Sequence, residues 1–163
     1  MDFSLPEKAW WGYVEEDIKE LLLTTQLLID KVGDWEEKFH DYAFVVFPAA
    51  KAYEGFLKKL FLDLGWISED DYFGKRFRIG KALNPSLEPE LRQREGVYDK
   101  IVEFCQGREL ADKLWETWGQ ARNSTFHWFP REKNVLSFEE AKQKVVMVIE
   151  AMDVAFGKCK IKE

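Results

Sequence analysis

The chain has 163 residues, 46% of them hydrophobic, and its thirteen Phe and seven Trp supply enough apolar surface for one domain with a substantial core. Its formal net charge of −6 argues against tight binding of nucleic acid over a broad surface, since such binding depends on many Lys and Arg contacts to phosphate. No apolar run approaches the ~18 residues needed to cross a bilayer, and the N-terminus lacks the basic-then-apolar layout of a secretion signal, so we expect a cytoplasmic protein without a membrane partner.

The first predicted helix covers about residues 8–32, where apolar residues recur at three- and four-residue intervals, and Gly33 ends it. Residues 1–41 carry eleven acidic and four basic side chains, and the helix dipole favours acidic residues early in a helix. Residues 1–33 are therefore expected to form an acidic N-terminal helix that precedes the core of the domain.

Asp34 is a natural N-cap for a second long helix, expected at about 35–64. Pro48 lies inside this helix and must remove one backbone hydrogen bond, so we expect a bend or a break there. The apolar run at 43–47 is also compatible with a strand. No partner strand is evident elsewhere in the sequence, and we therefore interpret the run as helix.

Residues 65–88 follow as a connection rich in Gly, Asp, Pro and aromatic residues. A connection of this length usually marks either a functional segment or short unrecognised structure. Two further helices are expected at about 89–105 and 108–127, separated by Gly107, and the second is ended by Pro130.

The last helix is expected at about 138–157, because Ser137 and Glu140 have the spacing of a capping box and the segment that follows has an apolar face. Five amphipathic helices without a convincing strand predict an all-α fold, an antiparallel bundle of four to five helices. We expect a single domain over residues 1–163, with its core at 34–157.

Arg122, Asn123 and His127 form the most informative motif of the chain, near the end of the fourth predicted helix. A guanidinium keeps its charge and presents a planar fork to phosphate oxygens, and an imidazole can take or give a proton near neutral pH. The Asn123 amide can hold a phosphate oxygen or orient the imidazole, or equally well make a helix-terminal hydrogen bond. Alone, an Arg-x4-His pair usually marks two surface residues at a helix end, so the rest of the chain decides its interpretation.

Metal-dependent chemistry is disfavoured because no group of His, Cys and Asp has ligand spacing, and no cofactor is expected. The only histidine besides His127 is His40, which is most simply a partly exposed residue of the second predicted helix. Cys105 and Cys159 fall on apparently helical segments without CxxC spacing. We therefore expect buried thiols rather than a disulfide or a metal site.

The motif resembles the signature of the HEPN superfamily (higher eukaryotes and prokaryotes nucleotide-binding domains), and a preceding block is similar to a core helix of those proteins. The matching residues are Lys51-Ala52-Tyr53-Glu54-Gly55-Phe56-Leu57-Lys58-Lys59-Leu60 with Leu64-Gly65, then Trp115-Glu116-Thr117-Trp118, Gln120-Ala121-Arg122-Asn123 and Phe129-Pro130. The pattern looks most like the helical domain of RNase LS-type ribonuclease toxins, and the resemblance covers about residues 34–157.

This resemblance implies a metal-independent endoribonuclease, a toxin or defence protein that cleaves RNA and has a cognate antitoxin as partner. His127 would act as general base on the ribose 2′-hydroxyl or as acid toward the leaving 5′-oxygen, while Arg122 stabilises the charge that grows on phosphorus. Helical spacing separates the two side chains by about 140°. A composite site in a homodimer, which the resemblance implies, or unwinding of the helix near Pro130 would reconcile them. The alternative is a non-catalytic HEPN module that recognises a protein partner or a nucleotide.

Lys51, Glu54 and Lys58 recur at i, i+3 and i+7 and form one polar stripe on the second predicted helix. The residues alone favour a solvated face with an ordinary ion pair. The resemblance implies instead that Lys51 and Glu54 support the active site, with Glu54 pairing with Arg122. Lys58 is a candidate RNA contact.

Residues 42–81 carry seven basic and five acidic side chains, so RNA is expected to approach there. Lys75, Arg76 and Arg78 surround Phe77 in a stretch that suits contact with an RNA backbone. A solvated loop is an equally good interpretation of the same stretch.

Overall fold

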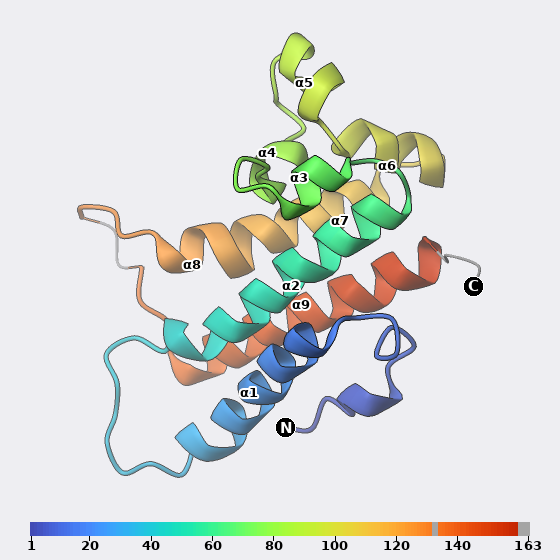
Figure 1. Ribbon diagram of the computed structural model, residues 1–163. Coiled ribbons are helices and arrows are strands. Elements are labelled where there is room, and N and C mark those ends of the chain that lie inside the picture. Colours follow the sequence, from blue (N-terminus) through green and yellow to red (C-terminus); the bar gives the residue numbers. More distant parts are fainter. Residues whose placement is uncertain (132–133, 160–163) are drawn as a thin grey trace.

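The computed structural model describes residues 1–131 and 134–159, and over these ranges it contains helices and no strand (Figure 1). The predicted all-α helical bundle is thus confirmed. No helix of the described ranges is long and apolar enough to span a membrane. The long elements of the bundle are α1 (Glu16–Val32), α2 (Ala43–Asp63), α7 (Glu109–Thr117) with its continuation, and α9 (Phe138–Lys158).

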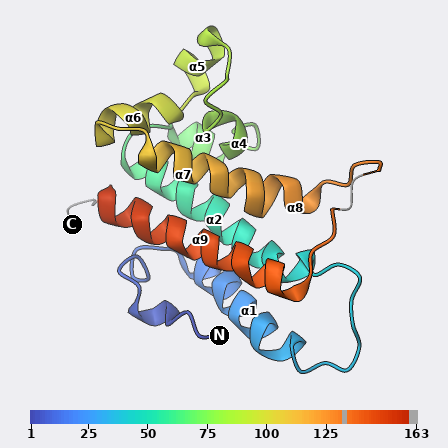
Figure 2. The ribbon, with the colours of Figure 1, turned by 180° about the vertical axis from the view of Figure 1, so that it is seen from behind.

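The second long helix, α2, lies at the centre of the bundle. It packs against α1 and α9, and α9 packs in turn against α7. Seen from behind, α2 is visible between α9 and the stretch from α7 to α8 (Figure 2). The buried hydroxyl of Tyr53 donates a hydrogen bond to the carbonyl oxygen of Leu114 at 3.1 Å, which ties α2 to α7. In the run at 43–47, Val45 and Val46 are buried whereas Phe44 and Phe47 are exposed, so the run is apolar on its surface side as well as in the core.

The acidic N-terminal helix expected over residues 1–33 is shorter than predicted, because α1 begins only at Glu16. A short 3₁₀ turn, η1 (Leu5–Glu7), precedes it. The fully buried Trp10 donates its indole N–H to Asp153 Oδ1 at 2.7 Å, and Lys8 Nζ donates to Asp153 Oδ2 at 2.6 Å. These bonds to α9 hold the first fifteen residues across the bundle instead of along α1.

The predicted start of the second helix, with Asp34 as its N-cap, is also wrong. Residues 34–42 are not helical, and α2 begins at Ala43. Asp41 Oδ1 accepts hydrogen bonds from the N–H groups of Ala43 and Leu136, at 2.9 and 3.1 Å, and the Tyr42 N–H donates to the Leu136 carbonyl oxygen at 3.0 Å. This pairing with a distant segment replaces the missing helical bonds. Pro48 lies near the start of the shortened helix and does not break it.

The connection at 65–88 contains two short helices, α3 (Glu69–Phe73) and α4 (Ile79–Ala82), which gather with their neighbours at one end of the bundle (Figure 1). The single helix expected over 89–105 is divided into α5 (Pro89–Glu95) and α6 (Tyr98–Cys105). Gly96 separates them with an extended backbone and donates its N–H to the Arg92 carbonyl oxygen.

The capping box at the start of α9 is confirmed, because the Ser137 hydroxyl accepts from the Glu140 N–H and the Glu140 carboxylate accepts from the Ser137 N–H. These hydrogen bonds from Ser137 lower the pKa of the Glu140 carboxyl. Both cysteines are free thiols, with Cys159 buried and Cys105 partly buried. Burial, and then the nearby Cys105, raise the pKa of the Cys159 thiol to about 12.

Candidate functional site

The helix that carries the Arg-x4-His motif changes its winding at the motif. The helix predicted over 108–127 consists of α7, a π-helical turn η2 (Trp118–Asn123) and one last turn α8 (Ser124–Phe126). Within it the Ser124 N–H donates to the carbonyl oxygen of Gly119, five residues earlier. Such wide turns are rare and frequently lie at functional sites. The turn also changes the angular separation that regular helical spacing predicts for Arg122 and His127.

Side chains hold this π-helical turn in place. The carbonyl oxygen of Gln120 accepts hydrogen bonds from Ser124 Oγ at 3.1 Å, Thr125 Oγ1 at 2.8 Å and Lys144 Nζ at 2.6 Å. Burial lowers the pKa of the Lys144 ammonium, which comes from the adjacent helix α9. The position of the motif is therefore set by packing between helices as well as by its own sequence.

Arg122 projects from the π-helical turn toward α2. Its guanidinium carbon lies 5.3 Å from the centre of the Trp118 ring, a stacked cation–π contact. Arg122 lines a pocket of about 100 Å³ together with Lys51 and Glu54. The structure thus brings together three predicted site residues, two of which lie about 70 positions from the third.

The expected ion pair between Glu54 and Arg122 is not formed among the described residues. The prediction of this ion pair is therefore wrong. The Arg122 guanidinium contacts the Trp118 ring instead, and the spacing of charged residues does not reveal such an aromatic contact. Lys51 Nζ similarly lies 5.9 Å from the centre of the Phe47 ring. Lys51, Arg122 and Glu54 therefore line one small pocket, and each of the two cations contacts an aromatic ring.

The remaining lysines of α2 have other positions. Lys58 is partly buried and does not line the pocket of Arg122. Lys59, the next residue, is bonded to Asp63 at 3.2 Å, and its Nζ lies 4.8 Å from the centre of the Tyr13 ring. Lys59 therefore belongs to the packing between α2 and the N-terminal segment.

His127 lies just beyond α8, in extended conformation, as the prediction of unwinding before Pro130 requires. It lines a second pocket, of about 590 Å³, and not the pocket of Arg122. Phe126 lines both pockets, so the two adjoin at this residue. Asn123 is exposed and lines neither of them.

The larger pocket contains residues that the sequence did not single out. His40, interpreted as a helical residue, lies instead in the non-helical segment 34–42 and lines the same pocket as His127. The signal available in the sequence was that these are the only two histidines of the chain. The other residues that line the pocket are Asp41, Thr125, Phe126, Trp128, Asn134 and Val135.

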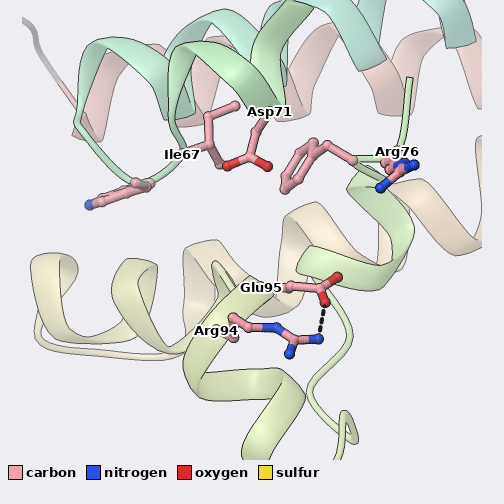
Figure 3. Close-up of a pocket in the computed structure, with 7 residues that line it drawn as sticks. Ile67, Asp71, Arg76, Arg94 and Glu95 are labelled. Carbon is pink, nitrogen blue, oxygen red and sulfur yellow. Dashed lines mark hydrogen bonds and ion pairs between the residues drawn. The ribbon is translucent and has the colours of Figure 1, made fainter. Parts of the chain in front are cut away.

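The basic stretch lies around a third pocket. Arg76 lines this cavity of about 400 Å³ together with Trp66 and Phe77, and Figure 3 shows Ile67 and Asp71 on one side of it and Arg94 and Glu95 of α5 on the other. Arg94 Nη2 is 2.9 Å from Glu95 Oε1, and hydrogen bonds from Lys81 and Arg94 lower the pKa of the Glu95 carboxyl.

The other two basic residues predicted to contact RNA are both exposed. The Arg78 guanidinium donates hydrogen bonds to the carbonyl oxygens of Lys75 and Phe77. The stretch is nevertheless connected to the motif, since α4 packs against η2 where Gly80 meets the Trp118 indole.

Among residues 1–131 and 134–159, no group of three or more His, Cys, Asp or Glu side chains is arranged to hold a metal ion. Comparisons with models of known protein families, with curated proteins and with solved structures gave no match. The function is therefore inferred from the side chains that line the two pockets of the motif.

Proposed function

We propose that the protein is a metal-independent endoribonuclease of the HEPN type. The observation that carries the proposal is the meeting of Lys51, Glu54 and Arg122 in one pocket, which shares the Phe126 ring with the pocket of His127. The sequence resemblance assigns these same residues to an active site. Their convergence from α2 and a π-helical turn supports that assignment.

In the proposed reaction the 2′-oxygen of a ribose attacks the adjacent phosphorus, and the bond from phosphorus to the 5′-oxygen breaks. His127 is exposed to solvent and able to exchange a proton with one of these oxygens. Arg122 and Lys51 supply positive charge for the phosphoryl oxygens, because a phosphate placed over Phe126 borders both pockets. Asn123, exposed beside Arg122, is available to a phosphate oxygen at the mouth of the site.

The direct test is incubation of the purified protein with total RNA, with and without EDTA. We expect cleavage in both conditions and products with 2′,3′-cyclic phosphate ends, because the 2′-oxygen is the nucleophile and no metal-bound hydroxide takes part. Loss of cleavage on chelation, or 5′-phosphate products, would contradict the mechanism.

We further propose that the protein acts as a homodimer that brings two motifs together. Large aromatic side chains are exposed near the motif, with Phe47 51% and Trp128 80% exposed, and a surface of this kind is typical of a protein contact. The other large apolar residues exposed in this region are Trp35, Phe39, Phe44, Phe129 and Val135.

The dimer is tested by light scattering on Trp128→Glu, with Phe73→Glu in α3 as the matched control, because Phe73 is 78% exposed and lines neither pocket of the motif. The first substitution should weaken the dimer and the second should not. A wild-type protein that is monomeric at concentrations where it cleaves RNA would refute the dimer.

In the cell, the proposed protein is a toxin or defence ribonuclease that acts on cytoplasmic RNA and is restrained by an antitoxin protein. The rival function is a non-catalytic module of the same family that binds a protein or nucleotide. The small volume of the Arg122 pocket and the net charge of −6 favour this rival. If the purified protein binds RNA at low salt but does not cleave it, the non-catalytic binding module is the correct function.

A further inference from the structure

The two histidines of the chain line one pocket although 86 residues lie between them in the sequence. His40 belongs to the segment that precedes α2, and His127 to the residue that follows α8. Asp41 is the one other titratable side chain among the described residues that line this pocket. The pairing therefore comes from the fold and not from local sequence.

Both histidine-bearing segments are fixed to the same short span of chain. Asn134 Nδ2 donates hydrogen bonds to the carbonyl oxygens of Ser124 and His127. Two residues later, the Leu136 N–H donates a hydrogen bond to Asp41 Oδ1, and the Leu136 carbonyl oxygen accepts one from the Tyr42 N–H, both next to His40. Residues 134–136 thus fix the backbone next to both histidines, and both side chains line one cavity.

The carboxylate of Asp41 is already used in this scaffold. It accepts the N–H groups of Ala43 and Leu136 and so fixes the backbone next to His40. Asp41 thus has a structural role through its Oδ1, whereas the imidazoles of His40 and His127 have the chemistry that suits both taking and giving a proton.

We infer that His40 is a second catalytic residue, the acid–base partner of His127 in RNA cleavage. Transesterification requires one group to remove the proton of the 2′-hydroxyl and another to protonate the departing 5′-oxygen. One imidazole takes the first proton as the bond from the 2′-oxygen to phosphorus forms. The second, as imidazolium, gives a proton as the bond from phosphorus to the 5′-oxygen breaks, so charge and protons balance.

This inference rests on the proposed ribonuclease function and adds a residue to it. The volume of the shared pocket, about 590 Å³, lies within the range of small-molecule sites, roughly 300–1,000 Å³, and so admits a nucleotide. A single histidine would have to perform both proton transfers or borrow a second from another chain. With His40 in place, each protomer of the proposed homodimer supplies both groups.

The test compares His40→Ala and His40→Gln with wild type and with Lys38→Ala, an exposed neighbour on the same segment. We expect both His40 variants to lose about 10²- to 10⁴-fold in cleavage rate, a typical contribution of general acid–base catalysis. Lys38→Ala should cleave like wild type. The bell-shaped pH dependence of wild type should lose one limb in the His40 variants, a change that a merely structural role would not produce.

A substrate with a sulfur in place of the 5′-bridging oxygen identifies the acid, because a thiolate leaves without protonation. It should restore cleavage to the variant of one histidine and not to the variant of the other. Full activity of His40→Gln, or loss of activity with both limbs of the pH profile intact, would overturn the inference. If the wild-type protein cleaves no RNA, the proposed function is overturned together with the inference. If wild type is active and the His40 variants cleave equally well, only the catalytic role of His40 is overturned.

Discussion

Replacing Gly80 with alanine tests how α4 supports the motif. A Cβ atom at this position would lie 2.4 Å from Trp118 Nε1, whereas Cβ contacts under 3.0 Å essentially do not occur. Trp118 is 7% exposed and its ring lies beneath the Arg122 guanidinium, so the indole has little room to move and its displacement would reach the site. Overpacking of this kind typically costs about 1–3 kcal/mol.

The matched control is Gly157→Ala in α9, because an added Cβ meets nothing within 4 Å there. Alanine is favoured over glycine inside a helix by about 0.5–1 kcal/mol, so this variant should be slightly more stable than wild type. The loss in one variant and the gain in the other add, so the two should differ in unfolding free energy by about 1.5–4 kcal/mol, with Gly80→Ala the less stable.

Urea denaturation followed by circular dichroism measures that difference, and the same samples are assayed for RNA cleavage. If Trp118 positions Arg122, Gly80→Ala should also cleave more slowly under conditions where it is fully folded. Equal unfolding free energies of the two variants would show that α4 shifts to accommodate the added Cβ without loss of stability. Lower stability with an unchanged cleavage rate would show that the Trp118 contact does not matter to the site.

Arg122→Ala and His127→Ala should each abolish RNA cleavage while keeping the helical circular-dichroism signal, since neither side chain is buried; loss of that signal would assign them to the scaffold. Glu54→Gln should slow turnover by an amount on the order of 10²-fold with little change in melting temperature, whereas Glu103→Gln on exposed α6 surface should match wild type. Ser137→Ala should destabilise the fold by about 0.5–2 kcal/mol through loss of the N-cap of α9. Because the Ser137 bonds lower the pKa of Glu140, ionised Glu140 stabilises the fold above the ordinary value of 4.5, and this contribution is lost as the pH falls through the lowered pKa. The stability difference between Ser137→Ala and wild type, measured by urea denaturation, should therefore narrow in acid; a constant difference would argue against the Ser137–Glu140 bond.

Several features of the fold follow from residues close together in the sequence. Apolar periodicity located the long helices, and the spacing of Ser137 and Glu140 identified the capping box at the start of α9. Lys51 and Glu54 lie one turn apart on α2, so they were expected to share a face and they line one pocket. Patterns over three or four residues reflect helical geometry directly, and the sequence is enough to recognise them.

Tertiary contacts decided the features that the sequence left open or assigned wrongly. The helix α2 begins at Ala43 and not near residue 35 as predicted, because Asp41 and Tyr42 form hydrogen bonds with Leu136, about 95 positions away. At the π-helical turn, Lys144 of another helix donates a hydrogen bond to the Gln120 carbonyl oxygen. His40 lines the pocket of His127 because its segment is not helical. Hydrogen bonds from Asp41 and Tyr42 to Leu136 stabilise this backbone, which the local sequence predicts to be helical. Such bonds join residues whose separation no local pattern encodes, and only the packed bundle brings them within reach.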